Sequence, residues 1–231
     1  MLNIVATPIG NLDDLSLRQA KTLLDSDIIL AEDTRSTQIL FDAIKTRFTL
    51  RAPRYTKLIS YYKEKEFEKL PEVIEYLKQN KNVSLISESG TPLVSDPGFL
   101  LVKTCIKENV PFTVIPGPSA VISSIVLSGF DPSQFMFLGF LPKNESEKNK
   151  ILKKLMLFKE SFKKLVFVFY ESPHRVTETL KSINQLDWNP DIVICREITK
   201  KFEEVIRGKT SELIKKSFKG ELTIILNYTF L

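Results

Sequence analysis

The chain has 231 residues, of which 43% are hydrophobic and 26% are charged. This length allows one large domain or two small ones. The composition is typical of a soluble globular protein and excludes a disordered or fibrous chain. No apolar run approaches the roughly 18 residues of a membrane span. The stretch Leu2–Ala6 reads as the start of a strand and not as a signal peptide.

The two cysteines, Cys105 and Cys195, stand alone in the sequence without a pairing motif. This usage indicates a reducing compartment, so we expect a cytoplasmic protein. The ordinary role of such isolated cysteines is that of small core residues.

The net charge of +5 is concentrated in one segment. Between Lys143 and Lys164 there are eight lysines and three glutamates. Such a lysine stripe attracts phosphates without reading a nucleotide sequence. The alternative is a solvated helix face.

Strand-like and helix-like segments alternate in the first half of the chain. Ser16 and Gln19 form a capping box that opens a helix with apolar residues at helical spacing. A second helix is expected over Glu64–Asn80, and Asp96 is expected to cap a third, with Pro97 at its first position. The strands are expected at Ile4–Thr7, Asp27–Ala31, Val83–Ile86 and Phe112–Ile115. This alternation favours a largely parallel sheet with helices on both faces.

The second half of the chain is richer in strands, which we expect at Phe135–Phe140, Leu165–Tyr170, Ile192–Arg196 and Leu222–Tyr228. Between the first two lies an amphipathic helix. Its apolar face is formed by Ile151, Leu155, Phe158 and Phe162, which leaves the lysines on the outer face. The sequence therefore predicts an α/β protein of two domains, residues 1–115 and 116–231, with a crevice between them.

Four loops follow predicted strands: Pro8–Asn11, Glu32–Arg35, Ser87–Gly98 and Pro116–Ala120. Ligands in open α/β sheets lie outside the carboxyl ends of the strands, so these loops are expected to converge on one site. Taken singly, each loop is also consistent with a plain turn.

The loops lack the motifs of the common nucleotide and metal sites. Neither a G-x-G-x-x-G fingerprint nor a G-x-x-x-x-G-K-[ST] loop is present. The prolines between Gly90 and Gly98 remove N–H donors that a phosphate cradle needs. His174 is the one histidine and the cysteines are far apart, so zinc is not expected, and there is no G-x-S-x-G elbow. These exclusions leave a mostly neutral ligand, held by backbone groups and small side chains, as the expected kind of ligand.

Eight motifs occur in a fixed order along the chain: ATPIGNLDDLSLR (6–18), AEDTRST (31–37), GTPLVSDPG (90–98), PGPSA (116–120), GFLP (139–142), FYESPHR (169–175), REITK (196–200) and KGE (219–221). Together they resemble the small-subunit ribosomal RNA (cytidine-2′-O)-methyltransferase family, within the tetrapyrrole-methylase superfamily. The resemblance covers essentially the whole chain.

The resemblance implies a fold of two α/β domains of the tetrapyrrole-methylase type, with S-adenosyl-L-methionine in the interdomain cleft, and a homodimer without a membrane partner. It also implies methyl transfer to the ribose 2′-oxygen of a cytidine in the decoding region of the small ribosomal subunit RNA. Positions that match the family's cofactor contacts are Pro8, Ile9, Gly90, Thr91, Val94, Ser119, Ala120, Tyr170, Arg196 and Glu221.

The chain departs from the family pattern in three places. Glu88 and Ser89 stand where the family usually has Asp-Ala before Gly-Thr-Pro. Tyr62 and Glu64 stand where the family often has histidines. Longer members carry a C-terminal extension, whereas this chain stops at Leu231. These departures bear on cofactor affinity and RNA binding more than on the reaction class.

Transfer to a ribose hydroxyl calls for alignment of the reacting atoms and for a general base. The cluster Glu32, Asp33 and Arg35 is our candidate for the catalytic or substrate-orienting group. The alternatives are a helix cap with an ion pair at this cluster, Glu171 beside His174 as the base, and arginines that clamp RNA phosphates.

Aromatic side chains at Tyr55, Tyr61, Tyr62 and Phe140 are candidates for stacking against unpaired RNA bases, and core packing is the alternative. Two other functions stay open from the sequence. One is an enzyme of the same fold that acts on a corrin precursor or a protein. The other is a non-catalytic relative that binds RNA or the ribosome.

Overall fold

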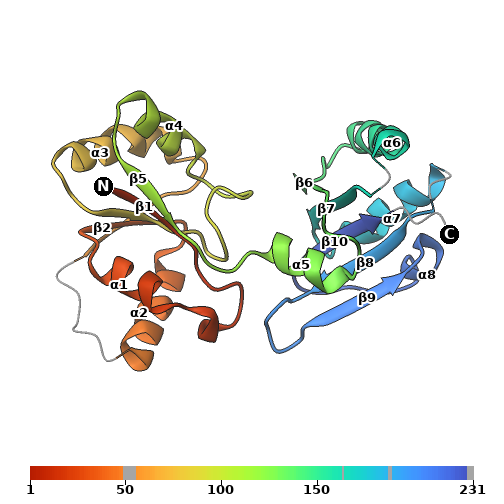
Figure 1. The fold of residues 1–231 in the computed structure, drawn as a ribbon, viewed down its shortest axis with the longest axis horizontal. Helices are drawn as coiled ribbons and strands as arrows, with labels where there is room; N and C mark the ends of the chain where they lie inside the picture. Colours follow the sequence, from red (N-terminus) through yellow and green to blue (C-terminus); the bar gives the residue numbers. More distant parts are fainter. Residues whose placement is uncertain (49–55, 163, 187–188, 228–231) are drawn as a thin grey trace. The chain divides into compact units, whose positions relative to one another are not determined.

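We describe the protein from a computed structural model, in residues 1–48, 56–162, 164–186 and 189–227 (Figure 1). The chain divides into two compact units, Met1–Ser119 and Ala120–Leu231, which we call unit 1 and unit 2. The domain boundary expected between Ile115 and Pro116 stays a prediction. None of the described helices is long and apolar enough to cross a membrane.

Unit 1 contains a five-stranded parallel sheet in the order β3-β2-β4-β1-β5. A helix lies between each pair of consecutive strands, as parallel pairing requires. The parallel sheet expected from the first half of the sequence is therefore confirmed. The strands are β1 (Leu2–Val5), β2 (Ile28–Ala31), β3 (Lys57–Ser60), β4 (Val83–Leu85) and β5 (Phe112–Ile115).

Helices cover both faces of this sheet (Figure 1). On one face, α1 (Leu17–Leu24) and α2 (Thr34–Arg47) bury apolar side chains against the strands. On the other face, α3 (Glu66–Lys78) and α4 (Phe99–Lys107) do the same. A short 3-10 helix, η1 (Leu12–Asp14), lies in the loop after β1. The capping box at the start of α1 is confirmed.

The start of α4 differs from the prediction. The helix begins at Phe99, after Gly98 with φ 123°, and Asp96 and Pro97 lie before it, so the cap expected at Asp96 is wrong. The acceptor comes instead from the first turn of α3. One carboxylate oxygen of Glu66 accepts hydrogen bonds from the N–H groups of Gly98, Leu100 and Leu101 at 3.2, 2.9 and 3.3 Å. A distant side chain thus satisfies the donors that a local cap usually satisfies.

Unit 2 contains a mixed five-stranded sheet in the order β6-β7-β10-β8-β9. Only the pair β6–β7 is parallel among the pairings described. Four of the strands confirm the sequence prediction, and β9 was not predicted. The strands are β6 (Phe135–Phe140), β7 (Val166–Glu171), β8 (Asp191–Arg196), β9 (Glu204–Gly208) and β10 (Leu222–Asn227).

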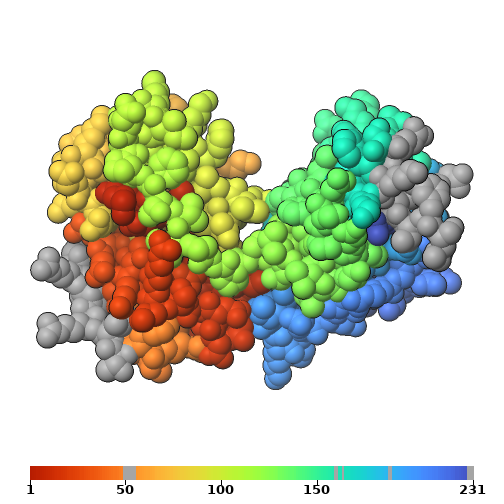
Figure 2. All heavy atoms as spheres, viewed as in Figure 1, coloured from red at the N-terminus to blue at the C-terminus, as the bar shows by residue number. Residues whose placement is uncertain are grey.

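The two faces of this sheet are covered by different helices. The main core lies between the sheet and α6 (Glu145–Ser161), α7 (Val176–Gln185) and α8 (Thr210–Leu213). Helix α5 (Ala120–Ser128) packs on β8 and β10 from the other face, where the thiol of Cys195 donates to the carbonyl of Ser124. On the face shown in Figure 2, closely packed atoms cover the elements of each unit.

The apolar face of α6 is displaced from the predicted one. Leu152 and Leu155 are buried, but Phe158 and Phe162 are 41% and 47% exposed. The lysines do not all lie outside either, because Lys148 is only 7% exposed. The expected apolar face is therefore wrong at the C-terminal end of α6, where two phenyl rings remain in contact with solvent.

Candidate active site

The parallel strands of unit 1 all end at the same edge of the sheet, so the loops after β1, β2, β4 and β5 meet there. We call this the unit 1 edge. The loops after β1 and β4 are joined by two backbone hydrogen bonds between Thr7 and Gly90, of 2.8 and 3.1 Å. The hydroxyl of Thr91 donates to the carbonyl of Pro118 at 3.3 Å and ties in the loop after β5. These three loops hold one another mainly through backbone groups.

Two glycines allow these loops to approach closely. Gly90 has φ +85°, and a Cβ there would lie 3.1 Å from Cγ2 of Ile9. A Cβ on Gly117 would lie 2.2 Å from Nε2 of Gln19. The Gln19 amide is held in place because it donates to the carbonyl of Ala6 at 2.8 Å. A side chain at Gly90 would be strained and would press on Ile9, and one at Gly117 would displace the Gln19 amide.

The predicted cofactor contacts fall into two sets. Those of unit 1 lie on the interlocked loops: Pro8, Ile9, Gly90, Thr91, Val94 and Ser119. Ala120 opens α5 in unit 2. The structure therefore brings the unit 1 set together, and the role of each residue stays a prediction.

Acidic side chains lie on the β2, β3 and β4 side of the same edge. Burial, with smaller contributions from the neighbouring Glu32 and Glu88, raises the pKa of Asp96 to about 6. Burial also raises the pKa of Glu32, with contributions from Glu88 and Glu64. The local motif Asp96-Pro97 predicts a helix cap and does not reveal that Asp96 belongs to this acidic group. The sequence feature that points to this group is that Asp96 and Glu88 lie in the same loop.

The three residues of the candidate catalytic cluster do not form a single group of contacting side chains. Asp33 caps α2 by accepting the N–H of Arg35 at 2.7 Å, and the Arg35 guanidinium pairs with the same carboxylate at 2.9 Å. These hydrogen bonds lower the pKa of Asp33. The Arg35 side chain is 89% exposed. Glu32 instead belongs electrostatically with the acidic residues of the neighbouring loops.

Unit 2 also gathers its motifs at one edge, which we call the unit 2 edge. The carboxyl ends of β6, β7 and β8 lie where β10 begins, because Leu222 is paired with both Glu171 and Arg196. Tyr170 packs against Phe137 and Phe140 there, with ring centroids 5.0 and 5.5 Å apart.

Charged side chains hold the loops of the unit 2 edge. The Arg196 guanidinium donates to the carbonyl of Lys219 at 2.6 Å, and Glu197 accepts the N–H of Glu221 at 2.8 Å. This last hydrogen bond is the main cause of the lowered pKa of Glu197. Lys200 pairs with Glu221 at 2.9 Å. The predicted contacts Arg196 and Glu221 are therefore brought together with Tyr170, and their role with a cofactor stays a prediction.

Glu171 and Arg175 have a structural task. The Glu171 side chain is fully buried and accepts from the hydroxyl of Thr179 at 2.7 Å and from Arg175 at 3.2 Å. Arg175 also donates to the carbonyl of Leu141 at 2.6 Å and so ties the end of β6 to the end of β7. Both side chains are occupied inside unit 2, which argues against Glu171 as a base and Arg175 as a phosphate clamp. His174 is exposed.

The candidate stacking residues have different surroundings. Tyr61 is 1% exposed and belongs to the core, so stacking by this ring is wrong as a prediction. Phe140 is 56% exposed. The Tyr62 ring is half-buried and lies 5.5 Å from the ammonium of Lys65. Tyr55 lies outside the described residues.

Both cysteines are free and buried, as expected for core residues. In the described part of the chain, no three His, Cys, Asp or Glu side chains are arranged to hold a metal ion. The chemistry of the two edges is therefore that of backbone groups, carboxylates, and lysine and arginine side chains.

Comparison with known proteins agrees with this fold. Residues 1–214 match the family of Tetrapyrrole (Corrin/Porphyrin) Methylases, so the chain belongs to that family. A solved structure titled diphthine synthase has a TM-score of 0.76 and 14% identity, covering 100% of this chain and 92% of the other; this likeness concerns the fold alone.

Curated relatives narrow the family further. The chain is 40% identical over 230 residues to ribosomal RNA small subunit methyltransferase I of Thermotoga maritima, covering 98% of this chain and 97% of the relative. It is 37% identical to the protein of the same name in Hydrogenobaculum sp., covering 98% and 95%. The chain thus belongs to the ribosomal RNA small subunit methyltransferase I group and is a methyltransferase that uses S-adenosylmethionine.

The unit 1 edge fits this cofactor. Its interlocked loops carry backbone polar groups and the half-buried Thr91 hydroxyl, which suit the mostly neutral parts of S-adenosylmethionine, whereas Pro8 and Ile9 are buried. The neighbouring acidic group, Glu32, Glu88 and Asp96, favours the positively charged sulfonium and amino groups. The unit 1 edge therefore offers suitable groups for both the neutral and the cationic parts of S-adenosylmethionine.

Proposed function

We propose that this protein methylates the ribose 2′-oxygen of a cytidine in the decoding region of small-subunit ribosomal RNA. The observation that carries the proposal is the pairing of a neutral, interlocked loop set with an acidic group at the unit 1 edge, in a chain of the methyltransferase I group. The loops suit the methyl donor, and the acidic group suits proton removal from a hydroxyl.

S-adenosylmethionine, when bound, supplies a methyl group on a cationic sulfur that is already activated for transfer. The residues that would hold it are those of the interlocked loops, Pro8, Ile9, Gly90, Thr91, Val94 and Ser119. From unit 2 we include Ala120, Tyr170, Arg196 and Glu221 in the proposal on the strength of the resemblance.

The protein's own contribution is alignment and proton removal. Holding the ribose hydroxyl in line with the methyl group accounts for about 7–11 kcal/mol of the barrier. In this proposal the carboxylate of Glu32 accepts the proton that the 2′-hydroxyl loses, a contribution of about 10²–10⁴-fold in rate. Its raised pKa makes it a better proton acceptor than an ordinary glutamate. Asp33 and Arg35 orient the RNA, with the exposed guanidinium directed at a phosphate.

We also propose a homodimer in the cytoplasm. Unit 1 exposes large apolar side chains on α4 and on β5, which is an edge strand of its sheet. Phe99 and Ile106 of α4 are 68% and 62% exposed, and Val114 of β5 is 46% exposed. An apolar surface of this kind is typical of a protein–protein interface, and a second copy of the chain is the partner we propose.

The test is methyl transfer to purified small ribosomal subunits and, in parallel, to bare rRNA, followed by mapping of the modified nucleotide. We expect a 2′-O-methylcytidine. Glu32→Gln is expected to lower kcat by about 10²–10⁴-fold at saturating S-adenosylmethionine. Methylation of a base, or full activity of Glu32→Gln, would contradict the proposal for the product or for the base, respectively. Asp33→Asn tests the orienting role in the same assay.

A further inference from the structure

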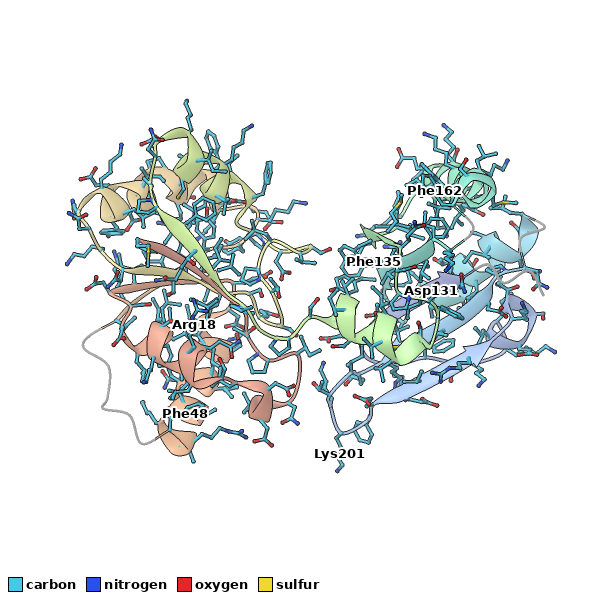
Figure 3. The ribbon with its side chains drawn as sticks, in the orientation of Figure 1. Arg18, Phe48, Asp131, Phe135, Phe162 and Lys201 are labelled. Carbon is cyan, nitrogen blue, oxygen red and sulfur yellow. The ribbon has the colours of Figure 1, made fainter. Side chains whose placement is uncertain are left out.

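An open cavity of about 460 Å³ lies in unit 2, away from the unit 2 edge. It is found where β6 and β7 begin, whereas the motif residues lie where these strands end. Figure 3 labels Phe135 of β6 and Phe162 at the end of α6, which line it from two elements. The lining residues are Ser133, Gln134, Phe135, Met136, Phe158, Phe162 and Leu165. We call this the phenyl cavity.

Three phenyl rings of the cavity remain open to solvent. Phe135, Phe158 and Phe162 are 43%, 41% and 47% exposed. The rings of Phe158 and Phe162 lie 6.3 Å apart at an interplanar angle of 36°. Grouped exposed aromatic rings are unusual on a protein surface without a ligand or partner. The volume lies in the range of small-molecule sites and leaves room for a flat nucleobase.

Positive charge approaches the same cavity along α6. Lys150 and Lys154 precede Phe158 at intervals of four residues and therefore share its face of the helix. Together with Lys153 they are exposed, and they form no ion pair among the described residues. At the other rim Lys164 pairs with Asp131 at 3.0 Å, so the carboxylate there is neutralised.

We infer that the phenyl cavity and these lysines bind an unpaired segment of the RNA substrate, with bases against the rings and phosphates along α6. Stacking on aromatic rings beside a positive surface is how proteins hold single-stranded nucleic acid without reading its sequence. A duplex hides its base faces, so the cavity favours unpaired RNA. The inference rests on the proposed function for the identity of the substrate.

The position of the cavity determines its effect on the reaction. The cavity lines neither edge, so it contributes binding that is equal in the ground state and the transition state. Such uniform binding lowers KM and leaves kcat unchanged. The phenyl cavity is therefore an anchor for RNA and not part of the catalytic machinery.

The experiment compares Phe162→Ala, Phe162→Leu and the control Phe67→Ala, whose ring is 80% exposed on α3. Fluorescence anisotropy measures binding of a labelled single-stranded oligoribonucleotide rich in cytidine and uridine, and of a duplex of equal length. We expect both Phe162 variants to bind the single strand about tenfold more weakly than the wild type and the control. Phe162→Leu keeps a large apolar side chain and removes only the flat ring, so a loss of binding in this variant is not caused by unfolding. Circular dichroism checks the fold, and KM for small subunits is expected to rise about tenfold at unchanged kcat and cofactor affinity.

Three results would overturn the inference. The first is a wild-type protein that prefers the duplex, and the second is a Phe162→Leu variant that binds the single strand within twofold of the wild type. The third is loss of self-association of the Phe162 variants in sedimentation, with unchanged RNA binding. The last would identify the cavity as an interface between copies. If the wild type binds RNA as expected but methylates no small subunit, the proposed function fails and the RNA-binding cavity stands. If small subunits are methylated but the Phe162 variants bind the single strand normally, the proposed function stands and the RNA-binding role of the cavity fails.

Discussion

The two sheets gather their motif residues at an edge by different means. The loops of the unit 1 edge are held by backbone hydrogen bonds, such as those between Thr7 and Gly90, and by glycines at points of close approach. The loops of the unit 2 edge are held by charged side chains, among them Glu171 with Arg175 and Glu197 with the backbone of Glu221. The parallel sheet explains part of this difference, because its loops all leave on the same side and lie close enough for their backbones to pair.

This contrast implies that the two edges are sensitive to different kinds of mutation. An edge built from backbone groups and glycines depends on shape, so added atoms damage it more than lost charges do. An edge held by charged side chains, among them the fully buried carboxylate of Glu171, depends on the partners being present, since a buried charge left alone is costly. Mutations at the two edges should therefore have opposite patterns, and four substitutions test this.

The largest effect is expected for Glu171→Ala in unit 2. The carboxylate is fully buried, and its removal leaves the Arg175 guanidinium without its anionic partner. Breaking a buried pair of this kind costs about 3–5 kcal/mol. Hydrogen exchange followed by mass spectrometry should show loss of protection in unit 2 and little change in unit 1. Glu178→Ala on α7 is the matched control, because its carboxylate is exposed, and it should leave protection unchanged. Equal protection in both variants would contradict the role of the buried pair.

Gly98→Ala should have the largest effect in unit 1. Gly98 has φ +123°, and a Cβ there would lie 2.5 Å from Cδ2 of the buried Leu85. Backbone strain and overpacking together are expected to lower the free energy of unfolding by about 2–3 kcal/mol. Gly129→Ala separates the two causes, because Gly129 has φ +75° and nothing lies within 4 Å of the added Cβ. We expect about 1 kcal/mol for this control in urea unfolding. Equal losses for the two variants would show that close packing contributes nothing at Gly98.

A pH-dependent effect is expected at Asp96. Burial raises its pKa from the ordinary 3.8 to about 6, so the folded state holds the proton more tightly than the unfolded state. The associated stability is fully present below about pH 4 and is lost as the pH rises through 6. Asp96→Asn removes this loss, so the variant should gain about 1–2 kcal/mol over the wild type between pH 4 and pH 7, allowing for partial exposure. Urea unfolding across this range measures the difference. A difference that does not vary with pH would contradict the raised pKa.

Periodicity and loop chemistry in the sequence predicted much of this fold. The parallel sheet of unit 1, the capping box at Ser16 and four strands of unit 2 follow from local patterns. Strands β3 and β9 do not. β3 has only one fully buried position, Ile59, and β9 is a polar edge strand with Ile206 as its buried residue, so neither carries a clear apolar pattern.

Long-range contacts explain what the sequence missed at the candidate site. The cap of α4 comes from Glu66, which lies far from Gly98 in the chain, so no local motif reveals it. Glu32 and Asp33 are adjacent in sequence, yet one belongs electrostatically to the acidic group and the other to α2. Their place after predicted strands indicated which loops form the unit 1 edge, but the partner of each charged side chain depends on tertiary contacts.

The smallest effect is expected for Arg35→Ala at the unit 1 edge. Its guanidinium is 89% exposed, and the alanine keeps the backbone N–H that Asp33 accepts as the cap of α2. Tm should therefore stay within about 1 °C of the wild type. Asp33→Ala removes the cap itself and is expected to lower Tm by about 2–4 °C. Differential scanning calorimetry measures both. If Arg35→Ala were as damaging as Asp33→Ala, a side-chain ion pair would stabilise the unit 1 edge, and its contrast with the buried Glu171 pair of unit 2 would no longer hold.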